Sequence, residues 1–126
     1  MHVPALLNEV IGLLKPQDGG IYLDGTLGYG GYSIAILRES DPNGIVYGFD
    51  LDKSAIEVAL GRLAEYGSRF RAVHCGYHEA REWLIESGVY AVDGIALDLG
   101  ISSTQIDDPE RGFSFRFEGP LDMRFD

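Results

Sequence analysis

Asp24-Gly25-Thr26-Leu27-Gly28-Tyr29-Gly30-Gly31-Tyr32-Ser33 is a glycine-rich stretch between an apolar run at residues 21–23 and a helical pattern at residues 34–37. This order predicts a turn from a strand into a helix. Such a turn lets the backbone approach a ligand closely, and the following helix offers free N–H groups. The spacing differs from the G-x-G-x-x-G pattern, so two interpretations stay open: a cofactor loop and a plain tight connection.

The rest of the chain alternates between expected strands and helices. We expect strands at residues 20–24, 45–50, 70–74 and 92–99, and helices at residues 4–14, 32–39 and 79–87, with a further helix opened by a capping box of Ser54 and Glu57. This alternation predicts the α/β class, with a mostly parallel sheet and helices on both faces. The fourth strand would then have an unpaired edge, so we expect further strands outside these residues.

The composition predicts one globular domain of 126 residues with a formal net charge of −10. This acidic balance argues against a general electrostatic grip on nucleic acid. The single cysteine, Cys75, excludes an internal disulfide and fits a reducing compartment. No segment resembles a signal peptide or a membrane span, and the three histidines lack metal-ligand spacing, so we expect a soluble cytoplasmic protein without a metal.

Three carboxylates fall at the carboxyl ends of expected strands: Asp24, Asp50 and Asp98. Ligands of open α/β sheets bind at this edge, and Asp50 follows Gly28 by 22 residues, close to the spacing of a ribose-binding acid. Carboxylates would repel a pyrophosphate but suit the sulfonium and ammonium groups of S-adenosylmethionine. Asp24 could instead cap the turn, and Asp98 could bond to nearby backbone.

Aromatic residues suggest two further contacts. Tyr77 follows the third expected strand, where its ring could lie on an adenine. Phe113, Phe115 and Arg116 belong to a segment that interleaves guanidinium groups with rings, the mixture that stacks unpaired bases and holds phosphates. A hairpin whose phenylalanines face the core fits the same alternation.

Four motifs make the chain recognisable: His2-Val3-Pro4-Ala5-Leu6-Leu7-Asn8-Glu9-Val10, Asp24-Gly25-Thr26-Leu27-Gly28, Asp98-Leu99-Gly100-Ile101-Ser102-Ser103, and Arg111-Gly112-Phe113-Ser114-Phe115 with Gly119-Pro120-Leu121-Asp122-Met123-Arg124. In these motifs the chain closely resembles the bacterial ribosomal RNA small subunit methyltransferase H family. The resemblance implies a Rossmann-like class I methyltransferase fold. It also implies methyl transfer from S-adenosylmethionine to the exocyclic N4 of a cytidine in 16S ribosomal RNA, with that RNA or the small ribosomal subunit as partner.

By position, the resemblance places cofactor contacts at a set of residues shared with the family motifs. They are Gly30, Gly31, Tyr32, Asp50, Tyr77, Asp98 and Gln105. Two of them depart from the family pattern, which usually has His at Tyr32 and Phe at Tyr77. Asp98 is also the candidate acceptor for the reacting amine.

Family members are considerably longer, so the resemblance covers only their N-terminal part. It divides the chain into a cofactor-binding Rossmann-like core at residues 1–103 and a motif loop at residues 104–126. Two other hypotheses remain: a nicotinamide-dependent oxidoreductase that uses the same loop, and a cofactor-binding fragment without catalytic activity.

Overall fold

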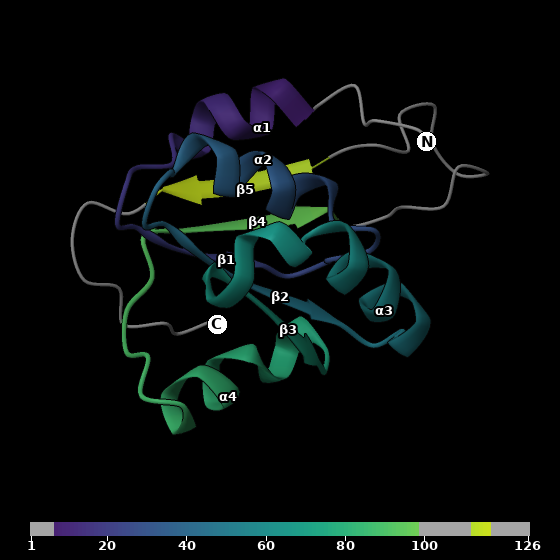
Figure 1. The fold of residues 1–126 in the computed structure, drawn as a ribbon. Coiled ribbons are helices and arrows are strands. Elements are labelled where there is room, and N and C mark those ends of the chain that lie inside the picture. Colours follow the sequence, from purple (N-terminus) through teal and green to yellow (C-terminus); the bar gives the residue numbers. More distant parts are fainter. Residues whose placement is uncertain (1–6, 99–111, 117–126) are drawn as a thin grey trace, which may run out of the picture.

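A five-stranded sheet in the order β3-β2-β1-β4-β5 forms the centre of the fold (Figure 1). The computed structural model describes residues 7–98 and 112–116. The elements in chain order are α1 (Leu7–Leu14), β1 (Ile21–Asp24), α2 (Gly31–Glu39), β2 (Ile45–Asp50), α3 (Lys53–Arg62), the 3-10 helix η1 (Ala64–Arg69), β3 (Phe70–His74), the 3-10 helix η2 (Tyr77–Glu79), α4 (Ala80–Glu86), β4 (Gly94–Asp98) and β5 (Gly112–Arg116).

The first four strands are parallel, as the alternation of strands and helices predicted. β1 pairs with β2 through Asp24 opposite Gly48, and with β4 through Asp24 opposite Ala96. The strand order therefore reverses at β1, with β2 on one side of it and β4 on the other. This reversal is the topological switch point at which open α/β sheets bind ligands.

Helices cover both faces of the sheet, with α1, α2 and α3 on one face and α4 on the other (Figure 1). Successive residues of a strand point to opposite faces, and neighbouring residues of β1 accordingly enter different cores. Tyr22 packs with the three-helix core, whereas Leu23 packs with the core under α4. Both side chains are almost fully buried, so β1 is covered on both faces as its apolar run predicted.

Three details differ from the prediction. β4 begins at Gly94, two residues later than predicted; just before it, the side chain of Asp93 accepts the N–H of Ile21 at 2.8 Å, and the N–H of Asp93 donates to the carbonyl of Ile21 at 2.7 Å. The predicted capping box of Ser54 and Glu57 is wrong: Asp52 is the N-cap of α3, and its Oδ1 accepts the N–H of Ser54 at 2.9 Å. A short carboxylate at this position captures the amides of the first helical turn.

The unpaired edge predicted for the fourth strand is also not found. β5 pairs antiparallel with β4, and positions Phe113 and Phe115 lie opposite Leu97 and Ile95. The alternating sequence of this segment therefore forms a strand of the same sheet. Among the described residues, no helix combines the length and the apolar character that crossing a membrane requires.

Candidate functional site

Asp24 ends β1 and holds the start of the glycine-rich loop from inside the protein. Its carboxylate is fully buried, where Oδ1 accepts the N–H of Thr26 at 3.2 Å and Oδ2 accepts the hydroxyl of Ser33 at 2.8 Å. It therefore ties the turn to the first part of α2. This arrangement matches the alternative in which Asp24 caps the turn, and Asp24 does not contribute a charge to an open acidic mouth.

Asp50 ends β2, and its side chain forms a hydrogen bond with the backbone of the glycine-rich loop. Its Oδ2 accepts the N–H of Gly28 at 2.8 Å, and its Oδ1 accepts the N–H of Asp52 at 2.8 Å. The side chain is half-buried, so its outer surface stays open to solvent. The structure thus brings together the carboxylate and the glycine-rich loop that the sequence spacing had paired.

Backbone bonds fix the middle of the loop. Leu27 donates its N–H to the carbonyl of Phe49 at 3.0 Å, and Gly30 donates to the carbonyl of Leu27 at 2.8 Å. Gly30 has a φ of 92°, in the left-handed region that favours glycine, and is the N-cap of α2. Among the described residues, no side chain caps α2 at this position. At the start of α2, the N-cap residue therefore contributes backbone alone.

Two residues of the predicted cofactor set begin α2. A Cβ built at Gly31 would meet no atom within 4 Å, so there is space beside the loop at this position. Tyr32 lies in the other direction, 5% exposed within the three-helix core. Any contact of Tyr32 with a ligand at this edge would consequently come from its backbone.

Tyr77 lies beside the first turn of the loop. A Cβ built at Gly25 would meet the Cβ of Tyr77 at 3.2 Å and would collide with the side chain of Leu97. A larger residue at Gly25 would therefore require the side chain of Leu97 to move and Tyr77 to shift slightly. The half-buried Tyr77 ring lies 4.2 Å from that of His78, centroid to centroid, with an angle of 31° between the planes.

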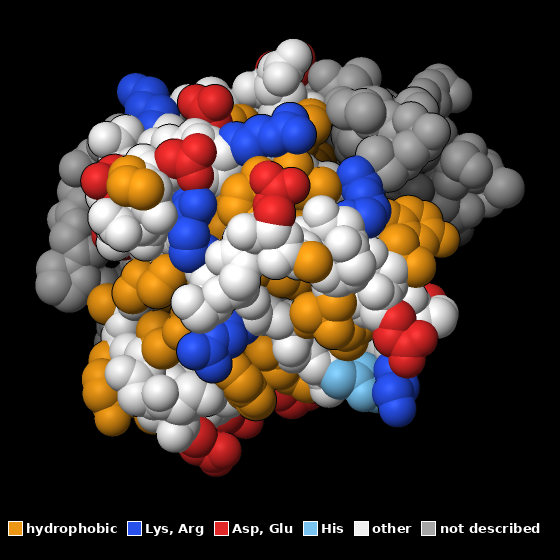
Figure 2. Space-filling model, in the orientation of Figure 1, with side chains coloured by type: hydrophobic (Ala, Val, Ile, Leu, Met, Phe, Trp, Pro, Cys, Tyr) orange, Lys and Arg blue, Asp and Glu red, His pale blue; other side chains and the backbone are white. Residues whose placement is uncertain are grey.

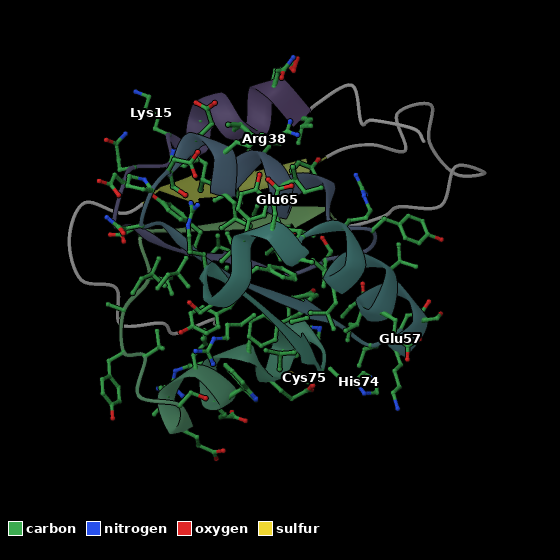
Figure 3. All side chains as sticks on the ribbon, viewed as in Figure 1. Lys15, Arg38, Glu57, Glu65, His74 and Cys75 are labelled. Atoms are coloured by element: carbon green, nitrogen blue, oxygen red, sulfur yellow. The ribbon has the colours of Figure 1, made fainter. Side chains whose placement is uncertain are left out.

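The segment after β3 completes the described part of this edge. The Nε2 atom of His74 lies 2.9 Å from the carbonyl oxygen of Leu51, whose side chain is 73% exposed next to Gly76. Cys75 follows His74 (Figure 3), and burial, with a smaller effect of Glu79, raises the pKa of its thiol. A raised pKa disfavours the reactive thiolate, which makes Cys75 a poor nucleophile.

Other predicted residues are placed only in part or not at all. The backbone of Asp98 ends β4, and the backbones of Phe113, Phe115 and Arg116 lie in β5. Gln105 lies outside the described residues. Within the described ranges, no group of three His, Cys, Asp or Glu side chains is arranged to hold a metal ion.

Two polar contacts of the site were missed by the sequence analysis. Ser33 bonds to Asp24, and Arg62 donates a hydrogen bond from Nη1 to the carbonyl of Tyr29 at 2.5 Å. Ser33 lies within the loop stretch and could have been found as a polar residue in the first turn of a helix. Arg62 lies 33 residues from Tyr29 in an ordinary helical pattern, which gives no local signal.

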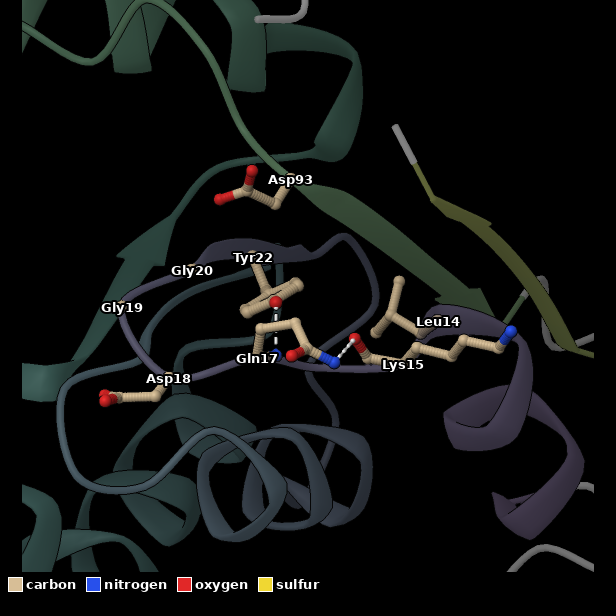
Figure 4. A pocket seen from close by; sticks show the side chains of 8 residues that line it. All are labelled: Leu14, Lys15, Gln17, Asp18, Gly19, Gly20, Tyr22 and Asp93. Carbon is tan, nitrogen blue, oxygen red and sulfur yellow. Dashed lines mark hydrogen bonds between the residues drawn. The ribbon is translucent and has the colours of Figure 1, made fainter. Parts of the chain in front are cut away.

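A cavity of about 250 Å³ lies at the opposite end of the sheet, before β1 and β4 (Figure 4). Inside it, Tyr22 Oη accepts the N–H of Gln17 at 2.7 Å, and Gln17 Nε2 donates to the carbonyl of Lys15 at 3.2 Å. These contacts tie the connection between α1 and β1 to the sheet. The cavity is remote from the carboxyl ends of the strands, so we do not assign the cofactor to it.

The surface in Figure 2 does not gather basic side chains into one patch. On this face, the Lys and Arg side chains of the described residues are interspersed with acidic and apolar ones. This distribution matches the acidic composition and gives no broad electrostatic surface for RNA in that part of the molecule.

The strand order, the switch point at β1 and the glycine-rich loop before α2 define a Rossmann-like fold of the methyltransferase type. Solved structures of methyltransferases have a similar fold. A methyltransferase homologue from Pyrococcus horikoshii superposes with a TM-score of 0.62 and 20% identity, over 73% of this chain and 29% of that one. An rRNA methylase from Streptococcus thermophilus gives a TM-score of 0.51 and 17% identity, over 72% and 66%. At these identities the likeness concerns the fold alone.

The chain belongs to the MraW methylase family, which it matches over residues 1–126. It is similar to the ribosomal RNA small subunit methyltransferase H of Syntrophobacter fumaroxidans, with 53% identity over 99% of this chain and 39% of the relative. The protein of the same name from Geotalea uraniireducens is 50% identical, over 99% and 40%. These relatives confirm the family that the sequence motifs indicated. The chain spans about two fifths of their length.

Proposed function

We propose that the chain binds S-adenosylmethionine at the carboxyl ends of β1, β2 and β4. In this proposal it forms the cofactor-binding part of an enzyme that methylates the exocyclic N4 of a cytidine in 16S ribosomal RNA. The observation that carries the cofactor assignment is the contact of Asp50 with Gly28, which places a half-open carboxylate against the glycine-rich loop. The name of the relatives supports an RNA of the small ribosomal subunit as substrate.

The groups at this edge fit the parts of S-adenosylmethionine. Asp50 would accept hydrogen bonds from the ribose hydroxyls, because a carboxylate has acceptor capacity beyond its two amide partners. The loop backbone at Gly30, Gly31 and Tyr32, where α2 begins, would lie against the methionine part of the cofactor, and the open space beside Gly31 would admit it. Tyr77 would contact the adenine, and Asp98 and Gln105 would complete the set.

S-adenosylmethionine supplies an electrophilic methyl group on a sulfonium. The cytosine amine is a poor nucleophile, since its lone pair is delocalised into the ring. We assign Asp98 to orient this amine and to accept a hydrogen bond from it as positive charge develops on nitrogen; the backbone carbonyl of Leu99 or Gly100 is the alternative acceptor. Phe113 or Phe115 would stack the base, and Arg116 would hold a phosphate.

The cofactor site and the complete activity are separate parts of this proposal. Because the chain spans 39% of the first relative, binding without methyl transfer is the expected behaviour of a cofactor-binding fragment. This chain can be incubated with 30S subunits, and methyl transfer can be measured as N4-methylcytidine after digestion of the RNA. A positive result would reject the hypothesis of a cofactor-binding fragment without catalytic activity.

Calorimetric titration tests the cofactor assignment. The chain should bind S-adenosylmethionine in preference to NAD, and Asp50→Asn should weaken binding about tenfold or more, because hydrogen bonds to a charged group are lost. Glu57→Gln is the matched control: Glu57 is exposed on α3 (Figure 3) and makes none of the described hydrogen bonds of the loop. Preferential NAD binding, or no binding of S-adenosylmethionine by a folded chain, would reject the assignment.

A further inference from the structure

The apex of the glycine-rich loop is Tyr29, and its side chain does not anchor the loop. The ring is 62% exposed, and the residues on both sides are glycines with positive φ, 53° at Gly28 and 92° at Gly30. Glycine backbones have wide conformational freedom, so this segment needs other contacts to keep one shape.

The end of α3 supplies such contacts. The guanidinium of Arg62, the last residue of α3, donates from Nη1 to the carbonyl oxygen of Tyr29 at 2.5 Å. Directly beside it, a Cβ built at Gly30 would meet Cδ1 of Leu63 at 2.7 Å and Cβ of Ala59 at 3.6 Å. The apex of the loop is therefore bonded through Tyr29 and packed through Gly30 by one short segment of chain.

Besides Asp24 at its start, the loop is held by side chains from two other elements, Asp50 of β2 and Arg62 of α3. Asp50 holds the N–H of Gly28 with a carboxylate that the proposed function also assigns to the ribose. Arg62 holds the carbonyl of Tyr29 with a group that has no assigned contact to the cofactor. A ligand that engages Asp50 would consequently leave the Arg62 tether in place.

We infer that Arg62 is a positioning residue for the cofactor: it orders the apex of the loop and so raises the affinity for S-adenosylmethionine without touching it. The inference rests on the proposed function. When the tether is absent, the loop must lose conformational freedom at the moment of binding, and this cost appears as weaker affinity.

The direction in which the affinity for S-adenosylmethionine changes when Arg62 is replaced distinguishes a positioning role from a purely electrostatic one. S-adenosylmethionine has a net positive charge, because its sulfonium and ammonium outnumber its carboxylate. Loss of a nearby guanidinium would by Coulomb interaction tighten the binding of this cation. The tether predicts the opposite, weaker binding when Arg62 is replaced.

The test compares Arg62→Met and Arg62→Lys with Arg38→Met in the whole chain. Arg38 is exposed in the last turn of α2 (Figure 3), so its replacement removes the same charge without touching the loop. Arg62→Met should weaken S-adenosylmethionine binding about three- to tenfold, the range for one hydrogen bond, and Arg62→Lys should restore part of the affinity. Arg38→Met should leave the affinity unchanged.

Amide hydrogen exchange without any ligand supplies the second measurement. In Arg62→Met the amide of Gly30 should exchange faster while the amides of β3 keep their protection, which a general loss of stability would not produce. Unchanged exchange at Gly30 would overturn the inference whether or not the chain binds S-adenosylmethionine. If the parent chain binds it and Arg62→Met binds equally well, the inference fails while the proposed function stands.

Discussion

The Oδ2 atom of Asp50 lies 2.8 Å from the backbone nitrogen of Gly28, although 22 residues separate them in the chain. The same carboxylate accepts the N–H of Asp52 through Oδ1. Asp50 thus holds the glycine-rich loop on one side and the start of the next helical unit on the other. Its proposed role in cofactor binding and its observed role in the shape of the loop therefore depend on the same carboxylate.

Asp50→Ala should make the amide of Gly28 exchange with solvent about tenfold faster, because the hydrogen bond that protects it is lost. Amide exchange followed by NMR measures this directly. Asp18→Ala is the matched control, since Oδ1 of the exposed Asp18 accepts the N–H of Asn43 at 2.9 Å in another part of the chain. It should speed exchange at Asn43 only. Equal exchange of Gly28 in the parent and Asp50→Ala would contradict the role of this bond.

Gly30→Ala should lower the free energy of unfolding by about 1–3 kcal/mol, the usual cost of holding a non-glycine residue in a strained backbone conformation. The φ of 92° and the contact of the new Cβ with Leu63 at 2.7 Å both act in this direction. Gly31→Ala is the control, because a Cβ there meets no atom within 4 Å. Denaturant unfolding should find Gly31→Ala as stable as the parent or more so; similar losses in both variants would refute the argument.

Arg69→Met should destabilise the chain by about 2 kcal/mol, because two partly buried carbonyl groups lose a charged donor. Arg69 donates from Nε to the carbonyl of Gly44 at 2.8 Å and from Nη2 to that of Leu37 at 2.7 Å. It also pairs with Asp41, whose side chain is 60% exposed. Asp41→Asn should therefore cost under about 1 kcal/mol in the same unfolding experiment, as exposed ion pairs do. A larger loss in Asp41→Asn than in Arg69→Met would reverse this ranking.

The stability contributed by Asp52 should depend on pH. Hydrogen bonds from the Ser54 hydroxyl, then from the N–H groups of Ser54 and Ala55, hold the pKa of the Asp52 carboxyl below its usual value. Because the pKa is lower in the folded state, the carboxylate stabilises the fold at neutral pH. This contribution is lost as the pH falls below about 4.

Thermal unfolding of the parent and Asp52→Ala at several pH values measures the contribution of Asp52. The parent should have the higher Tm at pH 7, and the difference should shrink on acidification. Asp52→Asn keeps a capping oxygen without a titrating proton, so its difference from Asp52→Ala should change little with pH. A gap between the parent and Asp52→Ala that widens in acid would contradict the assignment.

The sequence predicted those elements whose signals are local. Largely apolar runs predicted β1 and β2, and the spacing between Gly28 and Asp50 indicated that these two residues meet at the loop. The predicted N-cap of α3 was wrong. Ser54 and Glu57 match the sequence pattern of a capping box, but Asp52, two residues before Ser54, accepts the first amides of the helix instead. Propensity patterns do not decide between neighbouring capping candidates.

The remaining parts depend on contacts between distant segments. Arg62 bonds to Tyr29 across 33 residues, and the spacing of α3 predicts only which of its faces is buried. The partner of β4 was missed for a similar reason, because the alternation around Phe113 and Phe115 fits both an exposed stacking surface and a strand. Asp24 was ambiguous from its position alone, and its complete burial makes it a structural group.

The position of β1 between β2 and β4 also sets the order in which the fold can form during synthesis. β1, β2 and β3 can pair once residue 74 has left the ribosome, but the other edge of β1 must wait for residues 94–98. Until then, Gly25 lacks the β4 carbonyl of Ala96, to which its N–H donates at 2.9 Å. A nascent chain that pauses before residue 94 would therefore expose one edge of its central strand to other chains.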